Sequence, residues 1–190
     1  REIKDILAYL SLFLNHDDDV SLLRVIATPP RGIGQGTVAL ATQFSIDHKM
    51  SVFEALNDME FLATLTTRAQ NAIEEFVSFV HRYSDSAHTN GANYATMTDE
   101  LMKEISYSDF LKKNCKSPEE VDSRRRNVAE LLDGMHAHYE NSKKGLRGFL
   151  DSVALMQDKE NDDDQGQGVA TGTIFRASRV RFSKNSTRMK

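Results

Sequence analysis

Hydrophobic residues recur every three or four positions along most of this chain, and this spacing predicts helices. Residues 1–14 show it first, and their shared apolar face would carry Ile3, Ile6, Leu7, Leu10, Phe13 and Leu14. Similar patterns cover 20–27, 37–47, 68–83, 98–105, 109–114, 117–139 and 146–156. No useful strand alternation appears before Val169, so we expect an all-α, multi-helix domain with an irregular C-terminal tail.

Local capping signals mark where two of the later helices begin. Ser51 and Glu54 have the spacing of a capping box, in which each side chain accepts a hydrogen bond from the other residue's backbone. Ser117 followed by Pro118 is the strongest helix start in the chain, with Glu120 placed to cap in return. We expect the helix that begins here to continue to about residue 139.

Three other segments interrupt the helical pattern. The aspartates at 17–19 would cap the helix that follows them, although a divalent ion is an alternative use for three carboxylates. Residues 84–95 lose the hydrophobic spacing and predict a surface loop. Residues 158–168 are acidic, rich in Gly and Gln and poor in apolar side chains, so they predict a linker.

The segment 28–37, with the sequence TPPRGIGQGT, lies between two short predicted helices. Gly32 and Gly34 flank one β-branched residue, and both glycines can adopt positive φ. Ile33 would then point inward and fix the turn to the core. The sequence therefore predicts a helix-hairpin-helix-like element whose backbone N–H groups face outward.

Outward-facing amides beside a cation make a site for an anion. Arg31 adjoins the turn, and a helix that begins near Thr37 would add the positive end of its dipole. Gly-hydrophobic-Gly between helices is also the signature of helix-hairpin-helix DNA-binding modules, so a DNA phosphate is the expected ligand. An ordinary glycine-rich turn between helices remains the alternative.

Charge is distributed unevenly over the 190 residues, although the net charge is only −4. Residues 169–190 hold six Lys/Arg and no Asp/Glu, which leaves 18 Lys/Arg against 28 Asp/Glu, a net of −10, in residues 1–168. A body this acidic would bind DNA only through a small local contact. The arginines at 124–126 spread around a helix and indicate a solvated, salt-bridged face more than a DNA-binding stripe.

The remaining composition is that of a soluble protein, with 39% hydrophobic residues and no apolar run long enough to cross a membrane. Cys115 has no partner for an internal disulfide, which indicates a reducing compartment. No metal-binding histidine spacing, phosphate-binding glycine loop or nucleophile elbow is present. The chain starts at Arg1, inside a predicted helix, so we expect an excised piece or an incomplete gene.

Three blocks of this sequence resemble consecutive segments of the Rep/UvrD/PcrA helicases of superfamily 1. They are Arg1–Leu10, then Asp17–Asp19 with Leu23–Ile26, then Thr28–Gly34, in the family's order and spacing. The resemblance extends to about Gln167, strongly as far as Thr37 and loosely afterwards. Ser117–Glu120, leading to Arg126–Val128, is more similar to the Rep branch than to the others.

The resemblance implies a fragment of an ATP-dependent 3′–5′ DNA helicase of replication and repair. Residues 1–14 would be the exit helix of the second RecA-like motor lobe (subdomain 2A), and 15–157 would be the helical subdomain 2B. The parent enzyme would bind ATP and Mg²⁺ elsewhere, so this fragment would hold no catalytic, cofactor or metal site. The implied location is the bacterial cytoplasm, in association with the nucleoid.

In relatives, the Gly-Ile-Gly hairpin of subdomain 2B meets the backbone of the duplex at a fork junction. The resemblance therefore assigns DNA contact to Thr28, Arg31, Gly32, Ile33, Gly34 and Thr37. Pro30 stands where relatives commonly have a lysine, which removes one cation. The implied partners are duplex DNA and the motor subdomains of the same protein, with no membrane, and the helical body would regulate unwinding by swivelling.

The tail, 169–190, departs from the family. Relatives return to the motor lobe with a Thr-x-His-x-x-Lys-Gly-Leu-Glu segment, which this chain lacks. We expect a truncated or frame-altered end, and the alternative is a nucleic-acid-binding arm that uses its six basic residues with Phe175 and Phe182. Two other readings of the whole chain stay open, a stand-alone helix-hairpin-helix DNA-binding or adaptor protein without activity, and a related helicase-nuclease subunit.

Overall fold

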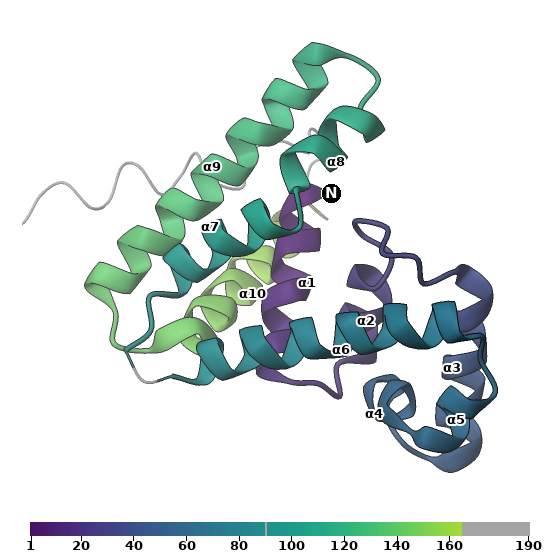
Figure 1. The fold of residues 1–190 in the computed structure, drawn as a ribbon. Coiled ribbons are helices and arrows are strands. Elements are labelled where there is room, and N and C mark those ends of the chain that lie inside the picture. The colour runs from purple at the N-terminus through teal and green to yellow at the C-terminus, as the bar shows by residue number, and fades with distance from the viewer. Residues whose placement is uncertain (90, 165–190) are drawn as a thin grey trace, which may run out of the picture. The chain divides into compact units, whose positions relative to one another are not determined.

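A computed structural model describes residues 1–89 and 91–164, and these residues form helices and connecting turns without any strand (Figure 1). The all-α prediction is therefore confirmed for this part of the chain. The helices are α1 (Glu2–Leu14), α2 (Asp19–Val25), α3 (Gln35–His48), α4 (Val52–Asn57), α5 (Met59–Ala63), α6 (Thr67–His88), α7 (Tyr94–Glu104), α8 (Tyr107–Asn114), α9 (Pro118–Asn141) and α10 (Gly145–Asp164). No helix among the described residues is long and apolar enough to span a membrane.

The contacts divide the chain into two units, 1–150 and 151–190, and α1 forms the centre of the first. Figure 1 shows α2 and α6 beside α1, and α9 also contacts this helix. Ile6, Leu10 and Phe13 are fully buried, as the hydrophobic spacing predicts, but so are Tyr9 and Leu12. The helix is buried on more sides than its apolar stripe indicates, because three neighbours cover it. The assignment of its residues to a motor lobe stays a prediction.

Aromatic rings of α1 and α6 form the middle of this core. The ring centroids of Tyr9 and Phe13 lie 6.0 Å apart, and each ring lies within 6.2 Å of Phe79 on α6. Phe13 also stacks on Tyr83 at 5.1 Å. Burying each of these side chains contributes roughly 1.5–3 kcal/mol to folding, so the α1–α6 contact is a main source of stability.

The predicted caps of α2 and α4 are confirmed. Asp18 caps α2 by accepting from the amide of Ser21, and the adjacent Asp19 accepts from the amide of Val52 at 2.8 Å. Ser51 and the Glu54 side chain form the expected capping box of α4. Two carboxylates of the acidic run are thus engaged with backbone amides.

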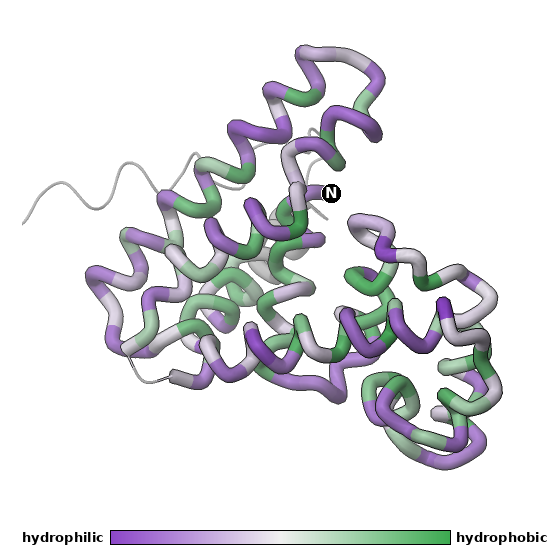
Figure 2. Tube along the Cα trace, in the orientation of Figure 1, coloured by the Kyte–Doolittle hydropathy of each residue, from purple (hydrophilic) through white to green (hydrophobic). Residues whose placement is uncertain are grey.

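Ser117 caps α9 as predicted, by accepting from the amide of Glu120, but the return contact differs. The Glu120 carboxylate accepts from the amide of Lys116, one residue earlier than a capping box requires. Figure 2 shows hydrophilic and hydrophobic stretches alternating along α9. Its buried residues are Val121, Leu131 and Met135.

The predicted surface loop and the predicted linker both differ from the structure. The predicted loop at 84–95 is wrong at both ends, because α6 continues to His88 and α7 already starts at Tyr94. Ser84 is buried and donates to the carbonyl of Phe13 at 2.8 Å, so a contact from another helix keeps this polar residue inside α6.

The second difference concerns the predicted acidic linker. Helix α10 runs through residues 158–164, so this part of the linker is helical. Acidic side chains are compatible with a helix, and their low hydrophobicity alone does not end one. Residues 165–168 and the basic tail, 169–190, lie outside the described residues.

Candidate nucleic-acid interface

In the hairpin between α2 and α3, Ile33 points inward as the sequence predicts, but the backbone conformation of Gly34 differs from the prediction. Gly32 has a φ of +82°, in the region that favours glycine, and Ile33 is 7% exposed. Gly34, however, has a φ of −74° and a ψ of 156°, so it is extended and is not a positive-φ residue. A β-branched residue at 34 therefore suits this backbone, contrary to the distortion expected for a positive-φ glycine.

The turn is fixed against α6. A Cβ atom added to Gly32 would lie 3.8 Å from the Cβ of Ala72, an ordinary contact distance, which shows how closely the loop approaches this helix. By contrast, Gly34 and Gly36 have nothing within 4 Å of an added Cβ. One side of the turn is therefore packed, and the other side is open.

The open side carries unpaired backbone amides. Within the described part of the chain, none of the amides from Gly32 to Thr37 donates a hydrogen bond, and Gly34 as N-cap provides no side-chain acceptor. Gly34, Gln35 and Gly36 are exposed, and Thr37 is half-buried. The helix that follows spans 14 residues, so its dipole adds a partial positive charge at this end. Free amides at a helix N-terminus can bind an oxyanion.

Arg31 does not lie where the sequence predicts. Its Nη1 donates to the carbonyls of Val25 at 2.9 Å and Pro29 at 3.1 Å, and its Nη2 donates to the hydroxyl of Tyr9. Its guanidinium carbon also lies 5.4 Å from the ring centroid of Tyr9 and 5.1 Å from that of Phe79. The cation is held on the packed side of the hairpin, because carbonyls and aromatic rings there offer more partners than the open side. Arg31 therefore stabilises the turn and is not a free cation beside the amides.

The predicted site residues thus separate into two groups. Gly34 and Thr37 line the open side, Ile33 and Arg31 face the interior, and Gly32 is exposed but approaches α6. The Thr28 carbonyl accepts from the Tyr9 hydroxyl and belongs to the second group. Whether any of these residues contacts DNA stays a prediction.

Sequence reasoning missed three residues of this site. Gln35 and Gly36 contribute amides because α3 begins two residues before the expected Thr37. The sequence signal for this earlier start was Gly34, since glycine is an acceptable N-cap residue. Tyr9, 19 residues before Thr28, contacts the hairpin from α1. Tyr9 lies outside the apolar stripe predicted for residues 1–14, so the sequence gave no sign of this role.

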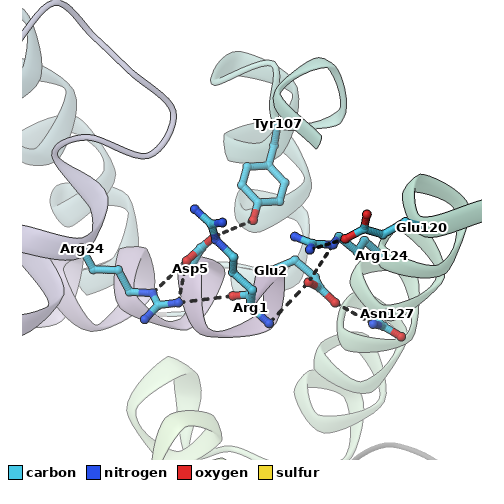
Figure 3. Close-up of polar contacts among 8 residues, drawn as sticks. All are labelled: Arg1, Glu2, Asp5, Arg24, Tyr107, Glu120, Arg124 and Asn127. Carbon is cyan, nitrogen blue, oxygen red and sulfur yellow. Dashed lines mark hydrogen bonds and ion pairs between the residues drawn. The ribbon is translucent and has the colours of Figure 1, made fainter. Parts of the chain in front are cut away.

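A second polar cluster lies at the start of α1 (Figure 3). Asp5 is 3% exposed, and its carboxylate accepts from Arg24 Nε at 2.8 Å and from the Tyr107 hydroxyl at 2.9 Å. Glu2 is 5% exposed and accepts from Asn127 Nδ2 at 2.6 Å. Burial raises the pKa of the Glu2 carboxyl, but hydrogen bonds led by that of Asn127 outweigh it, so the pKa lies below its ordinary value. The cluster joins α1 to α2, α8 and α9.

One arginine of the run at 124–126, Arg124, belongs to this cluster. Arg124 pairs with Glu120 at 2.6 Å and lies 3.9 Å from the Glu2 carboxylate, with its side chain 22% exposed. Arg125 donates to the hydroxyl of Ser108 at 2.6 Å. The salt-bridged interpretation is confirmed for Arg124.

Sequence comparison identifies the family of this chain. The profile of the UvrD-like helicase C-terminal domain matches residues 1–178. The chain belongs to the UvrD-like helicase C-terminal domain family. This confirms the resemblance drawn from the three N-terminal blocks.

The relatives of this UvrD-like domain include proteins named as DNA helicases. It is 29% identical over 192 aligned residues to the ATP-dependent DNA helicase PcrA of Bacillus subtilis (strain 168), covering 96% of this chain and 25% of that protein. The PcrA proteins of Staphylococcus epidermidis and Staphylococcus aureus are 28% and 26% identical, again over 96% of the chain. The chain spans about a quarter of the length of these relatives. The preference for the Rep branch stays a prediction.

Proposed function

We propose that this UvrD-like domain is the part of an ATP-dependent 3′–5′ DNA helicase that contacts duplex DNA near the fork and regulates unwinding. The observation that carries the proposal is the set of amides from Gly32 to Thr37 at the start of α3, which donate to no described residue and include those of the exposed Gly34, Gln35 and Gly36. Family membership supports a DNA ligand, and the dipole of α3 supports binding of its phosphates.

The contact would be small and made mostly by neutral groups. With Arg31 engaged on the packed side of the turn, the open side offers amides, and the body has a net charge of −10 over residues 1–168. The dependence of binding on salt grows with the number of phosphates neutralised by cations. We therefore expect weak binding with a shallow salt dependence.

The chemistry of unwinding would come from the rest of the parent protein. Motor subdomains outside this fragment would bind ATP and Mg²⁺, and the fragment by itself would neither hydrolyse ATP nor separate strands. A helicase acting on the chromosome would work in the bacterial cytoplasm at the nucleoid. The family match over most of the chain favours this proposal over a stand-alone adaptor.

Removing a single amide tests the proposal. Proline is tolerated at the first position of a helix, and the extended Gly34 before it is compatible with proline. Gln35→Pro would thus delete one N–H and keep α3, whereas Gln35→Ala keeps the N–H and serves as the matched control. We expect Gln35→Pro to weaken duplex binding about tenfold, because a hydrogen bond to a charged group contributes roughly 1.5–3 kcal/mol.

Binding is measured by fluorescence anisotropy with a labelled duplex at low salt, and helical content by circular dichroism. Equal affinity of the Gln35→Pro and Gln35→Ala chains, with both folded, would remove the α3 amides from the DNA interface.

A further inference from the structure

A single buried hydroxyl connects the central helix to the arm of the hairpin that precedes the glycines. Tyr9 on α1 is fully buried, and its hydroxyl donates to the carbonyl of Thr28 and accepts from Nη2 of Arg31. Arg31 in turn donates to the carbonyls of Val25 and Pro29. The residues just before the glycines are therefore hydrogen-bonded, directly or through one guanidinium, to α1.

The position of this hydroxyl is fixed by its surroundings. The ring of Tyr9 packs against Phe13, at 6.0 Å, and Phe79, at 6.2 Å. Burial raises the pKa of Tyr9 to about 12, although the neighbouring Arg31 lowers it, so the hydroxyl keeps its proton at neutral pH and remains a donor. Linked hydrogen bonds of this kind polarise one another and hold their members in one geometry.

The open side of the hairpin includes the first turn of α3, whose first backbone hydrogen bond joins the Val38 N–H to the Gly34 carbonyl at 3.1 Å. The amides from Gly32 to Thr37 themselves make no hydrogen bond within the described residues, so the place of this helix start against the core is set in part by the segment that precedes it. That segment, 25–31, is the one that Tyr9 and Arg31 bind. The burial of Ile33 holds the turn against the core but sets no hydrogen-bond direction.

We propose that Tyr9 is a positioning residue for the DNA contact: its hydroxyl, acting through Thr28 and Arg31, orients the Gly32–Thr37 amides toward a duplex phosphate. The inference rests on the proposed function. The Tyr9 ring supplies the packing of the core, whereas the hydroxyl adds the hydrogen bonds to Thr28 and Arg31 and a longer contact, 3.5 Å, with the carbonyl of Val25. Removing the hydroxyl alone thus separates positioning from folding.

The test compares Tyr9→Phe with Tyr94→Phe in the full chain. Tyr94 on α7 is a matched control, because it is 2% exposed and its hydroxyl is hydrogen-bonded to Nδ1 of His138, in a different part of the unit. Both variants lose a buried tyrosine hydroxyl and should lose similar stability. We expect only Tyr9→Phe to weaken duplex binding, by roughly threefold to tenfold.

A spectroscopic readout reports on the amides directly. In ¹H–¹⁵N NMR spectra of the DNA-free chain, Tyr9→Phe should shift the amide signals of Gly32, Gly34 and Gly36, and Tyr94→Phe should leave them in place. Should Tyr9→Phe fail to fold, Arg31→Lys, which keeps the charge and loses the planar fork, should give the same shifts and the same loss of affinity.

The outcomes distinguish the two proposals. If Gln35→Pro weakens binding but Tyr9→Phe binds like the unmodified chain, the role of Tyr9 is overturned and the amide contact stands. Equal losses in Tyr9→Phe and Tyr94→Phe would likewise overturn it, since they would reflect stability alone. If Gln35→Pro has no effect, the proposed DNA contact fails, and the positioning role fails with it.

Discussion

Gly34 is the N-cap of α3, and its lack of a side chain leaves the first amides of that helix without an internal acceptor. Serine or aspartate at this position would ordinarily satisfy one of these amides. The backbone of Gly34 is extended and the space around it is open, so neither conformation nor sterics requires glycine here. Glycine instead keeps the amides available to a ligand, at some expense of helix stability.

We therefore expect Gly34→Ser to change stability and binding in opposite directions. The serine hydroxyl would accept from the amide of Gly36 or Thr37, which should stabilise the fold by a few tenths of a kcal/mol and weaken duplex binding. Thermal melting and anisotropy titrations measure the two effects. Gly34→Ala, which adds a Cβ without an acceptor, is the control and should keep its affinity. A serine variant that is more stable and binds DNA equally well would contradict this view of Gly34.

Arg31 shows why the site could be predicted only in part. The glycines and Ile33 act through local backbone preference, and the sequence predicted the turn and the burial of Ile33 correctly. The direction of the Arg31 side chain depends on Tyr9 and Phe79, which lie 22 residues before it and 48 after it. Such a choice between solvent and interior is made by the tertiary structure, so local sequence could not predict it.

At the scale of elements, the turn between α1 and α2 is joined to α4 and α6 by aromatic contacts. The ring of His16 lies 4.5 Å from that of Phe53 and 5.3 Å from that of His81. His16 Nε2 is buried without a hydrogen-bond partner among the described residues. Burial, followed by the nearby His81 and His88, lowers the pKa of His16, although Asp17 and Asp85 oppose this effect.

This geometry predicts a loss of stability in mild acid. Because the pKa of His16 is lower in the folded chain than its ordinary 6.5, the unfolded chain binds the proton more readily. The contribution of neutral His16 is complete above pH 6.5 and is lost as the pH falls toward the folded-state pKa. We expect His16→Phe to reduce the decrease in melting temperature between about pH 7 and pH 5.

The exposed His136 provides the control. His136→Phe should leave the pH profile of melting as it is in the unmodified chain. Some dependence should remain in His16→Phe, because burial also lowers the pKa of His138. A profile unchanged by His16→Phe would show that protonation of the α1–α2 turn does not affect folding.

Helix starts marked by a capping residue were predicted well. Ser51 and Ser117 cap helices with residues only three positions away, so the signal is contained in the sequence. The end of α6 depends instead on Ser84, whose hydroxyl bonds to the carbonyl of Phe13, 71 residues earlier. Local composition there indicated a loop, and a contact from α1 outweighed it.

At the scale of the whole first unit, two buried carboxylates at the start of α1 connect helices distant in sequence. Asp5 joins α2 through Arg24 and α8 through Tyr107, which lies 102 residues away. Glu2 joins α9 through Asn127, 125 residues away. Removing one partner of a buried pair leaves the others desolvated and unpaired, which makes such contacts sensitive to substitution.

We expect Asp5→Ala to destabilise the fold by about 3 kcal/mol, measured by urea denaturation, since Tyr107 and the partly exposed Arg24 would both lose their acceptor. Asp109→Ala breaks an exposed pair with Lys112 instead and should leave the midpoint almost unchanged. Equal midpoints for the two variants would mean that the Asp5 cluster does not hold the helices together.

The inward orientation of Arg31 has a consequence for movement along DNA. Every phosphate presents the same oxygens whatever the base. A contact made by backbone amides therefore cannot distinguish one base pair of the duplex from the next. A contact made by neutral amides displaces few counterions from the DNA. Few counterions therefore have to bind the phosphates again when the protein dissociates, so dissociation is not slowed by a large electrostatic barrier. Under the proposed function, a helicase that moves by repeated binding and release would benefit from such weak binding to the duplex.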